Sequence, residues 1–274
     1  MYPILFEIGP FTVYSYGLML ALGFLIASWI MTKEYKRKSL DANLAGNITL
    51  IALVTGVIGA KVLYLLEHWN HFVADPSGMA FSPGGLSFFG GFLLATTSIY
   101  IYTRSKKINF LTVADGTAPG LMMGYGVARL GCHFAGDGDY GFPTDLPWGT
   151  DYSRGTYPPS EALRNFPEIT GRFPNGVVPD TILCHPTPVY EFLICALFFF
   201  VLWKYRTRIA TTGKLFMLYL TLAGLERFSI EFLRINPRVL FGLSEYQFIA
   251  AGLVLVGAIG WRLLSGRGRA SSPS

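Results

Sequence analysis

Residues 124–141 read GYGVARLGCHFAGDGDYG, which puts an arginine, a histidine and two aspartates at the end of an apolar, glycine-rich run. Arg129 lies within what reads as a membrane-spanning segment. A guanidinium at mid-bilayer costs about 2.5–3.5 kcal/mol on insertion scales, so it is tolerated only where it faces protein, water or an anionic partner. The rest of the chain must therefore provide a setting that stabilises this charge.

The composition is typical of a membrane protein. Of 274 residues, 51% are hydrophobic and 14% are charged, whereas about one residue in four is charged in soluble domains. The net charge of +5 comes from Lys and Arg residues concentrated in short loops between apolar runs, and this pattern determines membrane orientation. We therefore predict an all-α membrane protein with no nucleic-acid partner.

Seven apolar segments have the length that a helix needs to cross a bilayer. They cover residues 14–31, 44–66, 85–102, 110–134, 189–203, 214–232 and 245–264. The fourth is the least hydrophobic because it contains Asp115, Pro119 and five glycines, and we expect its helix to be kinked or broken. The first basic residue is Lys33, so the first segment is expected to be a retained span rather than a cleaved signal peptide.

The distribution of basic residues predicts the orientation of these spans. Fourteen of the 22 fall in inner loops or in the C-terminal tail: residues 33, 36, 37, 38, 104, 106, 107, 204, 206, 208, 214, 262, 267 and 269. Five lie outside, at residues 154, 164, 172, 234 and 238, and Lys61, Arg129 and Arg227 lie within spans. The positive-inside rule then puts the N-terminus outside and the C-terminus in the cytoplasm.

The segment 135–188 is long and rich in proline and glycine. It is too long for a plain connection between two helices, so we predict an extracytoplasmic head with little regular structure, inserted in a single membrane domain that covers residues 1–274.

The three cations within spans are predicted to share one depth. At about 1.5 Å per helical residue, Lys61, Arg129 and Arg227 all lie near the outer leaflet. The same layer contains Tyr16, His133, Asp137, Asp139, His185, Tyr190 and Glu191. Because a guanidinium matches phosphate oxygens in a bidentate manner, this layer suits an anionic phospholipid.

Plainer interpretations of the same residues remain open. Each cation could neutralise a local carboxylate, as Glu231 could for Arg227 and Glu67 for Lys61. His133 and His185 could be interfacial histidines bonded to the backbone, and Asp137 and Asp139 could cap a glycine-rich turn. Cys132, Cys184 and Cys195 have no metal-ligand spacing, so we expect no metal or cofactor, and pairing of Cys132 with Cys184 stays open.

Several motifs resemble the prolipoprotein diacylglyceryl transferases, a family of bacterial membrane enzymes. They occur in the family's order as YGLM (16–19), residues 61–64, GGLSFFGG (84–91), VADGTAP (113–119), ARLGCHFAGD (128–137), HPTPVYE (185–191) and ERFSIEFLR (226–234). The arginine motif of the fourth span and the HPxxxYE motif are specific together. The resemblance covers most of the chain.

The resemblance implies a multi-pass protein of the bacterial inner membrane, with its active site facing the outer leaflet. There it would move the diacylglyceryl group of phosphatidylglycerol to the lipobox cysteine of a preprolipoprotein, giving a thioether and glycerol 1-phosphate. By resemblance, Arg129 would hold the headgroup, Arg227 would assist at the leaving phosphate, and Glu231 would orient Arg227. His185, Tyr190 and Glu191 would shape the entrance for the peptide, and Tyr16 would hydrogen-bond the lipid.

The chain departs from the family's motifs at three points. Phe89 stands where the family has a histidine suspected of handling the thiol proton. The fourth-span motif, usually RxGNFxNGE, reads RLGCHFAGD, and we hypothesise that His133 replaces the missing base while Asp137 replaces the glutamate. Lys61 replaces an arginine and so loses bidentate geometry.

Two alternatives to a transferase follow from these residues. A phospholipid-binding homologue with altered catalysis would keep Arg129 and Arg227 and lack a base, as Phe89 permits. An anion transporter would use the same buried cations but needs an aqueous route to both sides, and the inner halves of the spans carry almost no polar residue beyond Asp115.

Overall fold

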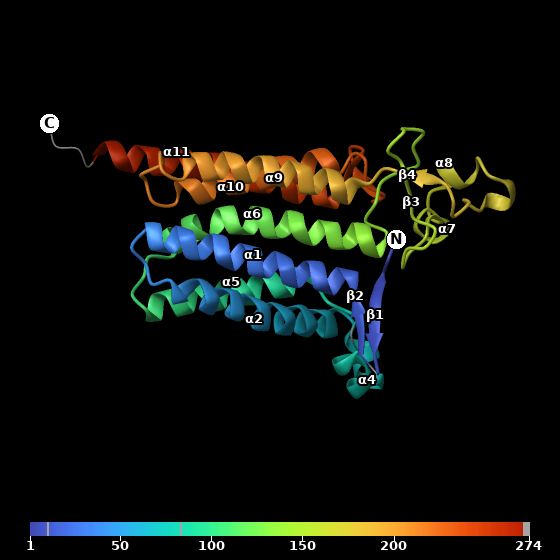
Figure 1. Cartoon of the computed structure of the whole chain (residues 1–274), viewed down its shortest axis with the longest axis horizontal. Helices are drawn as coiled ribbons and strands as arrows, with labels where there is room; N and C mark the ends of the chain where they lie inside the picture. The colour runs from blue at the N-terminus through green and yellow to red at the C-terminus, as the bar shows by residue number, and fades with distance from the viewer. Residues whose placement is uncertain (10, 83, 271–274) are drawn as a thin grey trace. The chain divides into compact units, whose positions relative to one another are not determined.

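The computed structural model describes residues 1–9, 11–82 and 84–270, and its long elements are helices (Figure 1). They are α1 (Ser15–Arg37), α2 (Asn43–Glu67), α5 (Phe88–Ser105), α6 (Phe110–Ala135), α9 (Thr187–Tyr205), α10 (Lys214–Ile230) and α11 (Glu245–Ala270). Each of the seven segments predicted as spans is thus helical. The side chains of residues 267–270 lie outside the described part, and with them the inner positions predicted for Arg267 and Arg269.

Four of these helices are long and apolar enough to cross a membrane: α1, α2, α9 and the Glu245–Gly266 part of α11. The predicted class of helical membrane protein is confirmed at this level. Seven crossings and their orientation stay predictions.

The described residues form two compact units, and the boundary between them falls within α1 and α6. One unit consists of residues 28–116, and the other of residues 1–27 together with those from 117 onward. Each unit is described by itself.

In the unit of residues 28–116, α2 and α5 pack side by side (Figure 1). They approach closely because glycines face each other: a Cβ built on Gly59 would lie 2.4 Å from the carbonyl oxygen of Gly90. A cluster that includes the buried residues Tyr35, Leu44 and Val113 forms the apolar core of this unit. The same unit contains α3 (Trp69–Ala74) and α4 (Pro76–Phe81), in the loop predicted to face outward.

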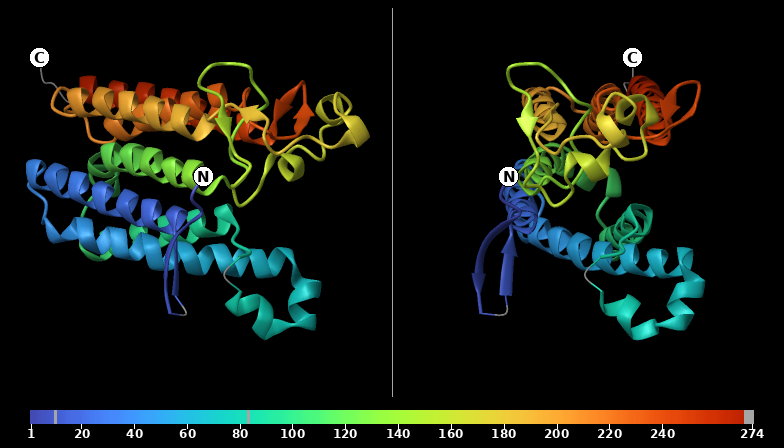
Figure 2. Two further views of the ribbon diagram at one scale, coloured as in Figure 1. Left: turned by 45° about the vertical axis from the view of Figure 1, so that its right-hand side comes forward. Right: turned by 90° about the vertical axis from the view of Figure 1, so that its right-hand side faces the viewer.

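In the other unit, α9, α10 and α11 lie alongside one another and neighbouring helices run antiparallel (Figures 1 and 2). Their core includes Met122 of α6, Cys195, Leu202 and Leu215, all buried. The short, apolar α9 begins with Pro188 in its first turn, where a missing N–H costs nothing because that group has no intrahelical partner.

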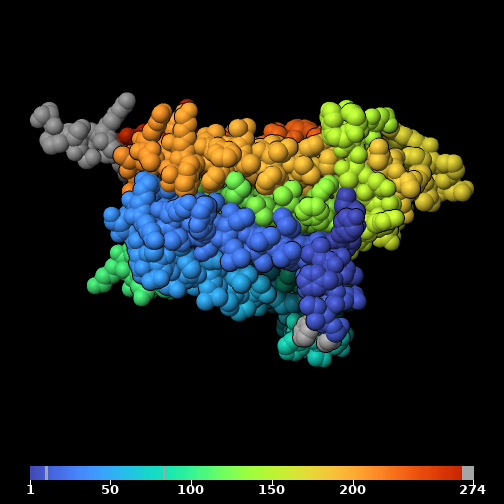
Figure 3. Space-filling model, in the orientation of Figure 1, coloured from blue at the N-terminus to red at the C-terminus, as the bar shows by residue number. Residues whose placement is uncertain are grey.

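The head begins where α6 ends and finishes at the start of α9, so it covers residues 136–186 rather than 135–188. It contains β3 (Thr150–Asp151), α7 (Pro159–Ala162), α8 (Pro167–Thr170), the 3-10 turn η1 (Pro174–Gly176) and β4 (Leu183–Cys184). Two small apolar clusters hold it together, one around Tyr140 and Tyr152 and one around Leu163 and Ile169. It gathers beyond the N-terminal end of α9 (Figure 3).

Two short hairpins, which the sequence analysis did not identify, accompany the predicted helices. The chain begins with a β-hairpin of β1 (Ile4–Ile8) and β2 (Phe11–Tyr14), and a second hairpin of β5 (Arg238–Leu240) and β6 (Leu243–Ser244) joins α10 to α11. The turn of the second hairpin has positive φ at Phe241 and Gly242, the backbone that matches the twist of paired strands. Sequence patterns of spans do not reveal such short strands.

The fourth helix, predicted to be kinked or broken, is not broken. α6 runs without interruption from Phe110 to Ala135 with Pro119 inside it. Asn109 starts the helix by accepting a hydrogen bond from the backbone N–H of Leu111 at 2.9 Å. Ala118 and Met122 on either side of the proline are buried, so tertiary packing outweighs the loss of one backbone donor.

The first helix extends past the predicted end at Met31 to Arg37, through most of the basic cluster. Arg37 binds Glu34 at 2.7 Å one turn earlier, and cations in a last turn are favoured by the helix dipole. The loop after it returns Lys38 to within 3.5 Å of Asp115.

The contact between α2 and α5 provides a test of this packing. Gly59→Ala is expected to lower the unfolding free energy by about 1–3 kcal/mol, because its new methyl group would lie against backbone atoms that cannot move aside. The measurement is thermal unfolding of the purified protein in detergent. Gly56→Ala is the control, since a Cβ at Gly56 meets nothing within 4 Å; equal losses in both variants would contradict this account.

Candidate functional site

The end of α6 turns back on itself through two glycines. Gly136 and Gly138 have positive φ, a backbone conformation that glycine adopts without the steric cost of a side chain. The N–H of Gly136 donates to the carbonyl of Cys132 at 2.9 Å, which closes the helix end. The reversed chain brings Asp139 back to Arg129, whose Nη1 lies 2.6 Å from Asp139 Oδ2.

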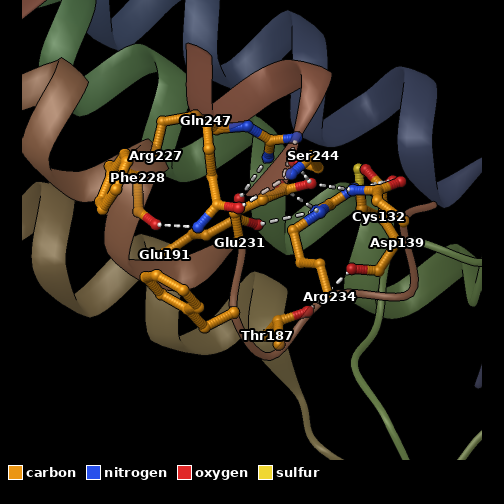
Figure 4. Close-up of polar contacts among 12 residues, drawn as sticks. Cys132, Asp139, Thr187, Glu191, Arg227, Phe228, Glu231, Arg234, Ser244 and Gln247 are labelled. Atoms are coloured by element: carbon orange, nitrogen blue, oxygen red, sulfur yellow. Dashed lines mark hydrogen bonds and ion pairs between the residues drawn. The ribbon is translucent and has the colours of Figure 1, made fainter. Parts of the chain in front are cut away.

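Glu191 lies at the centre of the site. Its side chain is fully buried, and its carboxylate accepts from Arg129 Nε at 2.6 Å and from Arg227 Nη1 at 3.2 Å. Arg234 Nη1 lies 3.5 Å from the same carboxylate, and the hydroxyl of Tyr125 donates to it at 3.4 Å. A buried carboxylate is stable only when paired, so Glu191 draws the cations of three chain segments together (Figure 4).

A second buried carboxylate, Glu231, holds the other side of the arginines. Arg227 Nη2 lies 3.0 Å from Glu231 Oε2, one helical turn away. The remaining oxygen of Glu231 accepts from Ser244 Oγ at 2.8 Å and from Asn236 Nδ2 at 2.6 Å. These hydrogen bonds fix the carboxylate and, through it, the Arg227 guanidinium.

Arg234 completes the site, although the sequence assigned it only to the external basic residues. It binds Asp139 in addition to Glu191, and its side chain is 7% exposed. A signal was available: Arg227, Glu231 and Arg234 follow one another at intervals of four and three residues, the spacing of one helical face.

The ion pairs of the site join three arginines to three carboxylates. Arg129, Arg227 and Arg234 face Asp139, Glu191 and Glu231 in equal number. Burial would raise the pKa of Asp139, but the charges of Arg129 and Arg234, together with hydrogen bonds from both guanidinium groups, lower it well below its usual value. Asp139 is therefore ionised at neutral pH.

Asp137, hypothesised to replace the glutamate of the family motif, makes no ion pair with an arginine among the described residues. Its Oδ1 accepts from the backbone N–H of Asp139 at 3.3 Å. Burial, and then the negative charge of Asp139, raise the pKa of Asp137. Asp139, not Asp137, is thus the carboxylate of this turn that ion-pairs with the arginines.

The other predicted site residues lie around this centre or away from it. His133 Nδ1 lies 3.0 Å from the hydroxyl of Tyr152 in the head. Tyr190 accepts from Trp148 Nε1 at 2.7 Å, and His185 Nδ1 lies 3.4 Å from the same hydroxyl. Tyr16 is exposed in the first turn of α1.

Lys61 belongs to the unit of residues 28–116 and is bound by the loop between α2 and α5. Its ammonium lies 3.2, 2.9 and 2.7 Å from the carbonyl oxygens of Met79, Ser82 and Gly84, and 3.1 Å from Ser82 Oγ. An ammonium has three donors, so these contacts occupy all of them. The pairing with Glu67 considered from sequence is replaced by this cradle.

The three cysteines are buried free thiols, and Cys132 and Cys184 do not pair. Cys132 Sγ and carboxylate oxygens of Asp137 and Asp139 lie within 4.8 Å of one another, a grouping that could hold a metal ion. However, Arg129 Nη1 lies 3.4 Å from that sulfur, and Asp139 already binds two guanidinium groups. The sulfur and the Asp139 carboxylate of this grouping are thus already engaged by arginine.

Comparison with known proteins identifies the family. The sequence model described as prolipoprotein diacylglyceryl transferase matches residues 3–263. The chain belongs to this family.

Relatives in the family are similar along nearly their whole length. The relatives considered are named phosphatidylglycerol–prolipoprotein diacylglyceryl transferase. The one from Clostridium tetani is 29% identical over 94% of this chain and 95% of its own length. The one from Dehalococcoides mccartyi is 31% identical over 93% of this chain and 89% of its own length. The one from Clostridioides difficile is 30% identical over 89% of this chain and 86% of its own length. The family predicted from the motifs is confirmed. Phe89 lies in the first turn of α5, and the residue is 46% exposed.

The buried position of Arg234 leads to a prediction. Arg234→Ala is expected to lower the unfolding free energy by about 3–5 kcal/mol, because it leaves Asp139 and Glu191 with too few cations in a desolvated site. Thermal unfolding in detergent measures the loss. Arg172→Ala, which removes an exposed arginine of the head, should change stability by no more than about 0.5 kcal/mol; a comparable loss there would contradict the assignment.

Proposed function

We propose that this protein transfers the diacylglyceryl group of phosphatidylglycerol to the thiol of the acceptor cysteine in a prolipoprotein. The observation that carries the proposal is the convergence of Arg129, Arg227 and Arg234 on Glu191 in a chain of this family. The chain's relatives are named for that donor and that acceptor. Guanidinium groups gathered at one buried point are suited to a phosphodiester headgroup.

The reaction requires a nucleophile and a stabilised leaving group. The cysteine thiolate attacks the carbon of the diacylglyceryl group that bears the phosphate ester. The bond from that carbon to the ester oxygen breaks as the carbon–sulfur bond forms, and glycerol 1-phosphate leaves with the bonding electrons. The thiol proton goes to a base, and the charge that develops on the phosphate is met by fixed cations. Preorganised charges of this kind usually make the largest contribution to lowering such a barrier.

Arg129 and Arg227 are the cations that we assign to the headgroup. Arg129 holds the phosphate, and Arg227 stabilises the leaving group while Glu231 fixes its orientation through the 3.0 Å contact. A phosphate oxygen can take the free donor of Arg129, since Nη2 is buried and has no hydrogen-bond partner among the described residues. Neither step calls for a metal ion or a cofactor.

Glu191 is better assigned to positioning than to the peptide entrance. Its carboxylate is fully buried and binds the arginines, so it is not exposed at the surface where the peptide would enter. The entrance for the lipobox segment is then shaped by Tyr190 and His185, with Trp148 on the Tyr190 hydroxyl. Tyr16 remains a candidate hydrogen-bond donor to the lipid, and Lys61 is assigned to holding its loop rather than to substrate binding.

The site is proposed to open at the outer leaflet of the bacterial inner membrane. This orientation rests on seven crossings and on the basic residues that follow α1, α5 and α9. Phosphatidylglycerol then enters from the bilayer, and the acceptor cysteine arrives from the extracytoplasmic side.

Transfer assays test the function. The protein in vesicles that contain radiolabelled phosphatidylglycerol is expected to label a lipobox peptide only when that peptide contains its cysteine. Arg129→Lys should lower the rate by about 100-fold or more, because an ammonium cannot replace a bidentate guanidinium. A phospholipid-binding homologue would bind the lipid and leave the peptide unlabelled, and that result would replace the proposed function.

The base is tested separately. We propose that His133 accepts the thiol proton in place of the family histidine at the position of Phe89. His133→Ala should lower the transfer rate by about 10²–10⁴-fold at pH 7, and the rate should recover as pH rises past about 8.5, where the acceptor thiol ionises by itself. His71→Ala, at an exposed histidine of α3, is the control. Full activity of His133→Ala at pH 7 would exclude His133 as the base.

A further inference from the structure

Asp139 has no counterpart in the motif by which the family is recognised, yet its side chain lies between two of the three site arginines. It binds Arg129 Nη1 through Oδ2 and Arg234 Nη2 through Oδ1 (Figure 4). One oxygen thus faces each guanidinium, which is the arrangement in which two oxygens of a phosphate would bind the same pair.

Asp139 differs from the other two carboxylates of the site in accessibility. Its side chain is 32% exposed, whereas those of Glu191 and Glu231 are fully buried. Glu231 is also fixed by Ser244 and Asn236. Asp139 is therefore the carboxylate that a ligand arriving from outside can displace.

The backbone around Asp139 allows the side chain to leave while the loop stays in place. The carbonyl oxygen of Asp139 accepts from Thr187 Oγ1 at 2.8 Å, which ties the residue to the start of α9. Gly138, immediately before it, has a φ of +86°. Rotation of the side chain about its own bonds thus needs no movement of the chain.

Departure of the carboxylate would leave the arginines with unfilled donors. Arg129 Nη2 and Arg234 Nε are buried and have no hydrogen-bond partner among the described residues, the latter lying 3.7 Å from Glu231. With Nη1 of Arg129 and Nη2 of Arg234 also released, four N–H groups could face one tetrahedral anion. The phosphodiester of phosphatidylglycerol has two unesterified oxygens, as a carboxylate has, and glycerol 1-phosphate has three.

We propose that Asp139 occupies the place of the substrate phosphate on Arg129 and Arg234 and sets the affinity of the site for the anionic headgroup by competing with it. This inference rests on the proposed function, since the anion in question is the phosphate of phosphatidylglycerol or of glycerol 1-phosphate. Asp139 stabilises the site when it is empty, and the substrate displaces it.

The test measures anion affinity and turnover in the intact protein. Asp139→Asn should bind glycerol 1-phosphate about tenfold more tightly, measured by ligand-induced thermal stabilisation in detergent, and should show a lower KM for phosphatidylglycerol with kcat changed less. Inorganic phosphate, titrated in parallel, separates recognition of a free phosphate from recognition of its glycerol ester. Asp139→Ser is the second variant if the asparagine form does not fold, and Asp139→Glu, which keeps the carboxylate, should retain the wild-type affinity.

Two controls separate displacement from a general gain of positive charge. Asp137→Asn changes a carboxylate two residues before Asp139, and Asp137 makes no ion pair with the arginines among the described residues. Asp145→Asn removes an exposed charge of the head. Neither should tighten glycerol 1-phosphate binding more than about twofold. An equal gain in Asp137→Asn, or unchanged or weaker binding in the Asp139 variants, would overturn the proposal.

The outcome also separates this inference from the proposed function. Wild-type transfer without a gain in affinity on substituting Asp139 would refute the inference and leave the function standing. Tighter anion binding by Asp139→Asn, in a protein that labels no peptide, would support the inference and remove the function.

Discussion

The buried carboxylate of Glu191 is the constraint on which the site depends. A charge with no exposed surface must be compensated by neighbours, and Glu191 is compensated by Arg129 of α6, Arg227 of α10 and Arg234 just beyond α10. Those arginines would be unstable in an apolar layer without a carboxylate to meet them. Each partner thus makes the others possible, and the three chain segments are fixed relative to one another by charge as well as by packing.

Backbone features around this centre determine which groups reach it. The glycines at residues 136 and 138 reverse the chain at the end of α6, so that a carboxylate returns to the helix it has just left. The hairpin between α10 and α11 brings Ser244 back to Glu231. Charge compensation thus determines which side chains pair in the site, and tight turns of the backbone bring those side chains together.

The sequence predicted the parts of this arrangement that depend on composition and on helical spacing. Hydropathy located the helices to within a few residues, except for the ends of α1 and α11, because a lipid-facing run must be apolar whatever it contacts. The convergence of Arg129 and Arg227 followed from depth along a helix. The contacts of Asp139, Arg234 and Lys61 could not be predicted from the sequence. Each depends on a loop whose path is determined by contacts between segments distant in the chain.

The pairing of charges in the site has a consequence for a protein that must bind an anion. Three guanidinium groups and three carboxylates form a network of ion pairs in which each arginine is already compensated without a ligand. An added phosphate would leave that network with an excess of negative charge unless one carboxylate gives up its place. Since Glu191 and Glu231 are fully buried, the carboxylate that gives up its place is the partly exposed Asp139. Affinity for the headgroup is then the difference between two anions competing for the same cations.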